Sequence, residues 1–254
     1  MTAIEVHPSP LVFSPAVPVL EGLSLRAAYA FASPRARLHR TRVWCQRVAR
    51  TAAGGLESSL KRGVDVVGAL TLLVALSPLL LLVALVVKLD GGPVLFWQRR
   101  VGRHGRLFWF PKFRSMVVNA EALKRQLLAR NDHGDSVTFK MKRDPRVTWI
   151  GRVIRKLSID ELPQLWCVLK GEMSMVGPRP PVPQEVAKYT LQQRRRLEVT
   201  PGLTCLWQIN GRGDIPFARQ VELDIEYIES QSLRTDLCIL LKTIPAVLLG
   251  RGAY

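Results

Sequence analysis

Residues 64–87 read VDVVGALTLLVALSPLLLLVALVV, a run rich in Val, Leu and Ala with Ser77-Pro78 near its middle. At a rise of about 1.5 Å per residue, a helix over this run is about 36 Å long, which is enough to cross a bilayer. Proline removes a backbone donor and clashes with the preceding turn. The run therefore predicts a helix that is kinked at Ser77-Pro78, with the Ser77 hydroxyl bonding a freed carbonyl.

Basic residues lie on both sides of this run, with Lys61 and Arg62 before it and Lys88 and Arg99 after it. A straight span would carry one basic side across the membrane, which the positive-inside rule disfavours. A re-entrant helix hairpin returns both ends to the cytoplasmic face and avoids that cost. Composition alone leaves a kinked transmembrane helix equally open, whereas a buried core helix of a soluble protein fits this length less well.

The composition limits the class of protein. The chain has 254 residues, a formal net charge of +17, 48% hydrophobic residues and a mean hydropathy of +0.10. These values exclude collagen, repeat arrays and a wholly disordered chain, and they fit one domain with or without an appendage. The expected partners are polyanions: nucleic acid, anionic lipid headgroups or phosphorylated substrates.

Residues 1–58 differ from the rest of the chain. They begin Pro-rich and then carry seven arginines between positions 26 and 50 with scarcely an acid, and no signal peptide fits there. Two interpretations stay open: a mobile leader, or a polybasic segment that binds anionic lipid at about 1 kcal/mol per basic residue.

The cysteines indicate neither a zinc site nor disulfides. Cys45, Cys167, Cys205 and Cys238 lie far apart with no C-x-x-C pair. Each has an apolar setting, so we expect free, buried, structural thiols in a reducing compartment.

Local patterns predict a mainly helical α+β fold. The apolar and aromatic runs 94–98 and 107–110, around glycines 102 and 105, predict a β-hairpin rather than a phosphate loop. Helices are expected over 117–130, 184–198, 217–229 and 232–249, the last with Ser232 as N-cap and bent or shortened by Pro245. Residues 131–146 are expected to form a loop, and short strands are expected near 203–210.

A further short helix is expected around Asp160-Glu161. Pro163 fits a first turn, so Asp160 is a reasonable N-cap and Gly171 a reasonable stop. The expected buried face consists of Leu162, Leu165, Trp166 and Leu169. As caps, the two acids would contribute about 0.5–2 kcal/mol and have no chemical role.

The same acids suit phosphoryl transfer. An aspartate such as Asp160 can attack phosphorus and form an acyl phosphate. Glu161 can hold Mg²⁺, which takes one or two carboxylates and completes its shell with phosphate oxygens and water. Lys112, Arg155 and Arg179 can supply positive charge around the transition state.

Six motifs in fixed order resemble those of the bacterial sugar transferase family, the polyisoprenyl-phosphate sugar-1-phosphate transferases. They are Lys61-Arg62 with the Ser77-Pro78 run, Lys112-Phe113-Arg114-Ser115-Met116, Asp160-Glu161-Leu162-Pro163-Gln164-Leu165, Met173-Ser174-Met175-Val176-Gly177-Pro178-Arg179-Pro180, Pro201-Gly202-Leu203-Thr204 and Asn210-Gly211-Arg212. The resemblance covers residues 58–254. It favours the re-entrant helix hairpin over the kinked span.

The resemblance implies a reaction and roles. Asp160 would attack the β-phosphate of a UDP-sugar, form a phosphosugar-enzyme and release UMP, with Mg²⁺ on Glu161. Undecaprenyl phosphate would then take the sugar phosphate, as the first membrane step of exopolysaccharide or other glycan synthesis. Lys112, Arg155 and Arg179 fall on basic active-site positions of the family, and Asp224 falls on an acidic one.

The resemblance also implies substrate-binding positions at Gln208, Asn210, Gly211 and Arg212, and it makes anionic lipids, not nucleic acid, the surface partner. Cys167 and Cys205 depart from the residues usual at their positions. The expected organisation is a compact member: a leader over 1–58, a re-entrant membrane helix over 59–90 and a catalytic domain over 91–254. The expected location is the cytoplasmic face of a bacterial inner membrane.

Two other functions stay open. A basic membrane-anchored binding module would use Asp160-Glu161 only as a cap, and a metal-dependent phosphatase would release phosphate without an acceptor lipid. The sequence leaves the sugar open among glucose, galactose and N-acetylated sugars. It also leaves a homodimer open.

Overall fold

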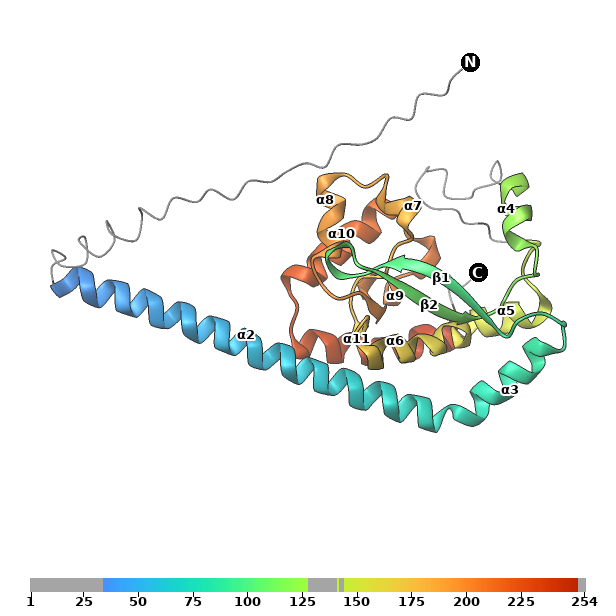
Figure 1. The fold of residues 1–254 in the computed structure, drawn as a ribbon, viewed down its shortest axis with the longest axis horizontal. Coiled ribbons are helices and arrows are strands. Elements are labelled where there is room, and N and C mark those ends of the chain that lie inside the picture. The colour runs from blue at the N-terminus through green and yellow to red at the C-terminus, as the bar shows by residue number, and fades with distance from the viewer. Residues whose placement is uncertain (1–33, 128–140, 142–143, 251–254) are drawn as a thin grey trace, which may run out of the picture. The chain divides into compact units, whose positions relative to one another are not determined.

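The computed structural model describes residues 34–127, 141 and 144–250, drawn in Figure 1. The chain divides into two compact units, residues 1–55 and 56–254. Helix α2 (Pro34–Ala75) begins in the first unit and ends in the second. Residues 1–33 of the expected leader, and most of the loop expected over 131–146, lie outside the described residues.

Helices α2 and α3 (Ser77–Lys88) meet at Leu76, where the axis bends by 61°. Pro78 lies in the first turn of α3, and the Ser77 hydroxyl donates to the carbonyl of Val74 at 2.8 Å. Both details confirm the predicted kink. Among the described helices no single one is long and apolar enough to span a membrane, while the bent pair 55–75 and 77–88 passes that test together.

Polar side chains on one face of α2 tie it to the rest of the second unit. Arg62 donates to the last carbonyls of α6 (Leu165–Lys170) at 2.6 and 2.7 Å, and Asp65 accepts from the Met175 N–H at 2.9 Å. Lys61 pairs at 2.5 Å with Asp236 of α11 (Leu233–Leu249). In Figure 1 α6 and α11 accordingly lie along α2.

The predicted hairpin is confirmed and is longer than expected. Strand β1 (Leu95–Val101) pairs antiparallel with β2 (Leu107–Phe113), with Gln98 opposite Phe110 and Arg100 opposite Phe108. A single 3-10 turn, η1 (Arg103–Gly105), joins them, with His104 in the left-handed region at φ 55°. Paired residues share a face of the sheet, so the even-numbered residues of both strands lie together.

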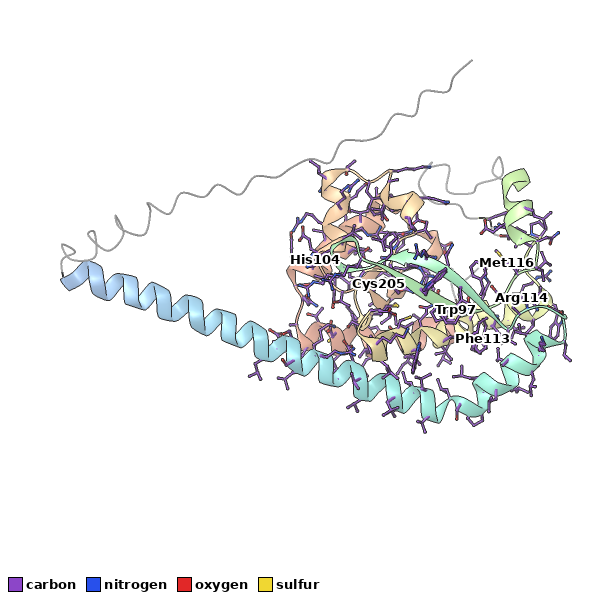
Figure 2. All side chains as sticks on the ribbon, in the orientation of Figure 1. Trp97, His104, Phe113, Arg114, Met116 and Cys205 are labelled. Carbon is purple, nitrogen blue, oxygen red and sulfur yellow. The ribbon has the colours of Figure 1, made fainter. Side chains whose placement is uncertain are left out.

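Arg114 fastens the end of α3 to the start of the hairpin. Its buried guanidinium donates to the carbonyls of Val87 at 2.9 Å and Pro93 at 2.8 Å, and it lies 3.7 Å from the Asp90 carboxylate. Figure 2 labels Arg114 at this junction. The Val87 carbonyl in the last turn of α3 thus obtains a donor from the residue that follows β2.

Helix α5 (Trp149–Lys156) packs Ile150 and Ile154 against Val83 and Val87 of α3. The Thr148 hydroxyl accepts from the Gly151 N–H at 3.0 Å and caps α5. Before it, α4 (Ala120–Leu127) is confirmed within the predicted range 117–130.

A second, two-stranded parallel sheet closes the core. Strands β3 (Ser174–Val176) and β4 (Gly202–Thr204) pair there. A Cβ on Gly202 would lie 2.0 Å from the Gly177 nitrogen, so only glycine permits this approach. The core beside it includes Phe110, Leu165, Val176 and Tyr227.

Two predicted elements near the C-terminus are confirmed. Helix α10 (Phe217–Glu229) has the predicted bounds. Helix α11 begins after Ser232, whose hydroxyl accepts from the Thr235 N–H at 3.1 Å, and Pro245 lies within it.

Two other predictions are wrong in detail. The single helix expected over 184–198 is broken into α7 (Pro183–Val186), α8 (Leu191–Arg194) and the 3-10 turn η4 (Arg195–Leu197). Thr190 interrupts it because its side chain forms a capping box and starts a new helix. Of the region expected as strand near 203–210, only β4 is extended, and α9 (Leu206–Ile209) follows it.

Two burial predictions are also wrong. Trp166 is 52% exposed, although Leu165 is fully buried. The preceding turn is a 3-10 helix with about three residues per turn, which aligns Leu165 rather than Trp166 with Leu162. Cys238 is exposed on α11, whereas Cys167 and Cys205 are free and buried as expected.

Candidate active site

Asp160 lies in the first turn of the 3-10 helix η3 (Ile159–Gln164), which joins α5 to α6. The prediction that Asp160 is an N-cap is wrong. The residue before the helix is Ser158, in the left-handed region at φ 55°, and the turn closes with Glu161 N–H donating to Ser158 at 3.2 Å. The helix therefore begins at Ile159, one residue before Asp160, and Pro163 lies inside it without an N–H to donate.

The Asp160 side chain is buried but unpartnered. It is 6% exposed, and within the described chain its carboxylate takes part in no hydrogen bond or ion pair. Burial raises its pKa to about 6, assisted by Glu161 and opposed by the charges of Lys112, Arg155 and Arg179. At neutral pH Asp160 is therefore an available carboxylate beside several cations.

The Glu161 carboxylate, unlike that of Asp160, has a bonded partner. Arg179 donates to both of its oxygens, at 3.1 and 2.5 Å. Burial alone would raise the pKa of Glu161, but the charge and hydrogen bonds of Arg179 outweigh it and lower the pKa to about 2. The two neighbouring carboxylates thus differ: one is held in a bidentate pair and the other is unbonded.

Lys112 on β2 reaches the same site, as predicted. Its amine lies 5.7 Å from the centre of the Phe110 ring. Burial, together with Arg100 and Arg179, lowers its pKa to about 8. The three cations predicted from the sequence, Lys112, Arg155 and Arg179, all act on Asp160.

Arg100 on β1 is a site residue that the sequence analysis missed. Burial and the charge of Arg179 lower its pKa to about 10, and Glu185 and Glu161 oppose that shift. The strand alternation held a usable signal, because Arg100 and Lys112 are both even-numbered residues of the hairpin and share one face.

Arg212 belongs to the site, and the other predicted substrate-binding residues lie beside it. Arg212 donates to the Ser158 hydroxyl at 3.2 Å, and its pKa is lowered by burial while Glu161 and Asp160 raise it. It begins the 3-10 turn η5 (Arg212–Asp214) at φ 52°, directly after Gly211 at φ 145°. Gln208 accepts from the Cys205 thiol at 3.1 Å, and Asn210 is exposed at the end of α9.

Asp224 lies in a separate buried cluster. It is 0% exposed and pairs with Arg196, with contacts of 2.7 and 2.6 Å, and Arg196 also donates to the Tyr189 hydroxyl at 3.0 Å. Burial raises the pKa of Asp224 to about 6 against the charge of Arg196. The charge of Asp224 raises the pKa of the Cys205 thiol and the charge of Arg179 lowers it. This cluster therefore borders the Asp160 site without bonding to Asp160.

The donor set fits Mg²⁺ only together with a phosphate. In the part of the chain that the structure describes, no three His, Cys, Asp or Glu side chains gather as metal ligands. Mg²⁺ needs only one or two carboxylates when phosphate oxygens and water complete its shell. Asp160 has unbonded oxygens, but Glu161 would have to exchange Arg179 for the metal.

The chain matches known proteins over most of its length. The family model described as bacterial sugar transferase matches residues 56–250. Galactosyl transferase CpsE of Streptococcus agalactiae is 49% identical over 194 residues, covering 76% of this chain and 43% of that protein. UDP-galactose-lipid carrier transferase of Erwinia amylovora is 42% identical over 236 residues, covering 91% and 49%.

A third relative is undecaprenyl-phosphate galactose phosphotransferase of Salmonella typhimurium. It is 45% identical over 198 residues, covering 77% of this chain and 42% of that protein. The chain therefore spans less than half the length of each of these three relatives.

Proposed function

The chain belongs to the bacterial sugar transferase family, and on that premise we propose that it transfers a sugar 1-phosphate from a UDP-sugar to undecaprenyl phosphate. The names of two relatives support this substrate pair, since one is a UDP-galactose-lipid carrier transferase and the other an undecaprenyl-phosphate galactose phosphotransferase. The product would be the first lipid-linked sugar of an exopolysaccharide or another glycan.

One observation carries the proposal: Asp160 is buried among cations and yet bonds to nothing in the described chain. A carboxylate that only caps a helix would accept a backbone N–H, and Asp160 does not. A nucleophilic carboxylate needs an oxygen without a bonded partner, and it must be ionised at working pH. A pKa of about 6 leaves Asp160 ionised at neutral pH.

In the first half-reaction an Asp160 oxygen attacks the β-phosphorus of the UDP-sugar. A new O–P bond forms, the bond to the bridging oxygen breaks, and its electron pair leaves with UMP. Lys112, Arg155 and Arg179 stabilise the negative charge on the transferring phosphoryl group. In the second half-reaction an oxygen of undecaprenyl phosphate attacks the same phosphorus, and the electron pair of the broken bond returns to Asp160.

Glu161 is proposed to hold Mg²⁺ together with the diphosphate. When bound, the metal would neutralise phosphate charge. Arg179, which pairs with Glu161 in this structure at 3.1 and 2.5 Å, would then turn its guanidinium to the phosphate. Asp160 would stay free for attack.

A lipid acceptor requires the site to lie at a membrane, and we propose the cytoplasmic face of the inner membrane. Exposed apolar side chains cover the outer side of α2, α3 and α11, and Figure 2 shows those of α2 and α3 pointing away from the rest of the unit. They include Leu60, Val64, Val67, Leu70, Val74, Leu81, Leu82, Leu85, Leu241, Ile244 and Leu248. The bent helix pair is proposed to enter one leaflet and hold the chain there.

The test is to incubate the detergent-held chain with Mg²⁺ and a panel of UDP-sugars without acceptor lipid. The expected result is a mass gain of one sugar phosphate and release of UMP with at least one donor. Asp160→Asn should show neither. Glu222→Gln, which changes an exposed acid on α10, is the matched control and should behave as the unaltered chain.

A phosphatase and a binding module would give different results in the same experiment. A phosphatase would release sugar phosphate or inorganic phosphate continuously without lipid. A binding module would give no adduct, no UMP and no product after undecaprenyl phosphate is added. Product formation that needs both substrates, with no adduct, would contradict the covalent step but keep the transfer.

A further inference from the structure

Arg100 and Arg99 are adjacent on β1 but lie on opposite faces of the hairpin. Arg99 is exposed, with its guanidinium 5.2 Å from the Trp109 ring centre. Arg100 lies 5.0 Å from the ring centre of Phe110, the same ring that Lys112 approaches. One aromatic side chain therefore brings two cations together on the inner face.

Arg100 is anchored at one end only. Its Nη1 donates to the carbonyl of Pro180 at 2.9 Å, directly after Arg179 in the chain. Its Nε is buried and has no partner, and within the described chain no carboxylate forms an ion pair with it. The charges of two glutamates, Glu185 and Glu161, raise its pKa, but neither pairs with it: Glu161 is bonded on both oxygens by Arg179, and Glu185 accepts from the Val182 N–H.

Lys112, like Arg100, forms no ion pair with a carboxylate in the described chain. Within the described residues its amine makes no hydrogen bond or ion pair, and it lies 5.7 Å from the centre of the Phe110 ring. A buried cation without a counter-ion is unfavourable, and both pKa values reflect that, about 10 for Arg100 and about 8 for Lys112. Two neighbouring cations that lack an anion form a site for one.

The hairpin orders these two cations relative to Asp160. Lys112 lies on β2, the strand that packs against η3, which carries Asp160. Arg100 lies on β1, so it is one strand farther from η3 than Lys112 is. In an in-line displacement the leaving oxygen lies on the far side of phosphorus from the nucleophile.

We propose that Arg100, together with Lys112, forms the subsite for the phosphate that leaves with UMP, and that the phosphate of the lipid acceptor then occupies the same subsite. The proposal rests on the proposed function. The bond from phosphorus to the bridging oxygen breaks with its electron pair on UMP, whose phosphate pairs with Arg100. The lipid phosphate then enters from the position that UMP vacated, so its oxygen approaches in line with the Asp160–phosphorus bond.

The experiment compares Arg100→Gln with Arg99→Gln, which removes the same charge one residue away on the outer face. UMP binding is measured by calorimetry, and each half-reaction is timed separately by adduct formation and by transfer to undecaprenyl phosphate. Arg100→Gln should weaken UMP binding and raise the KM for UDP-sugar about tenfold or more. It should also slow adduct decay with lipid, while Arg99→Gln stays within about twofold in every measurement.

Arg100→Lys keeps the charge and guards against misfolding, which a thermal melt of each variant monitors. It should restore part of the UMP affinity, because an amine keeps the attraction and loses the planar fork. Equal UMP affinity for Arg100→Gln and Arg99→Gln in folded protein would overturn the proposal. If Arg100→Gln slows only adduct formation and leaves transfer to undecaprenyl phosphate unchanged, the shared subsite for the lipid phosphate is overturned. If the unaltered chain forms no adduct and no lipid product, the proposed function itself fails.

Discussion

The chain buries two aspartates whose pKa values both rise to about 6, but their surroundings differ. Asp224 is fully enclosed and paired with Arg196 through contacts of 2.7 and 2.6 Å. Asp160 lies among more cations and bonds to none of them. The raised pKa therefore does not distinguish the two aspartates, whereas the presence or absence of a bonded partner does.

The largest expected effect comes from Asp160→Asn. Because Asn cannot form the acyl phosphate, adduct formation should fall at least about a thousand-fold. The free energy of unfolding should stay the same or rise slightly, since burial opposes the ionised carboxylate. Intact mass and a thermal melt on one sample check both results, and retained adduct formation would place the nucleophile elsewhere.

Asp224→Ala should act on stability instead. It leaves the Arg196 charge buried and unpaired, which costs about 3–5 kcal/mol of unfolding free energy. A urea titration in detergent measures this cost. Glu222→Ala, which breaks an exposed pair with Arg219 on the same helix, should cost at most about 1 kcal/mol. Equal costs for the two changes would refute the distinction between the buried and the exposed pair.

The pH dependence should report Asp160 and Lys112. The kcat/KM for UMP release should fall below a pH of about 6, as Asp160 takes up a proton, and above about 8, as Lys112 loses one. Lys112→Arg should shift the alkaline limb upward, because arginine stays protonated. An alkaline limb that does not move in this variant would assign it to another group.

A smaller effect than that of Asp224→Ala is expected for Tyr189→Phe. It removes the hydroxyl that accepts from Arg196 at 3.0 Å and keeps the ring 5.7 Å from the guanidinium. The expected loss is about 1–2 kcal/mol of unfolding free energy, with adduct formation unchanged. A large loss of adduct formation would couple the Asp224 cluster to the chemistry.

The sequence predicted the elements better than the contacts between them. The kink at Ser77-Pro78, the hairpin and the helix 217–229 follow from local rules on proline, alternation and apolar period, and all three are confirmed. The helix expected over 184–198 failed because the Thr190 capping box competed with helical continuity. The N-cap expected at Asp160 failed because a 3-10 helix begins one residue earlier, at Ile159, after Ser158 in the left-handed region.

The motifs predicted which charged residues lie together but not which of them form ion pairs. Lys112, Arg155, Arg179 and Asp160 were expected together, and the structure brings them together. That Arg179 bonds Glu161 rather than Asp160 could not be read from residues 18 or 19 positions away. Arg100 was missed because the alternation of the predicted hairpin, which places it on the same face as Lys112, was not applied to it.

The sequence by itself determined the family, through six motifs in fixed order, and the local elements, through proline, glycine and apolar spacing. The tertiary structure alone decided which aspartate is bonded and which is free, and that Arg179 pairs with Glu161. The physical reason is that hydrogen bonds and charge interactions depend on distances of a few ångströms and on burial, and both arise only when segments far apart in the chain pack together.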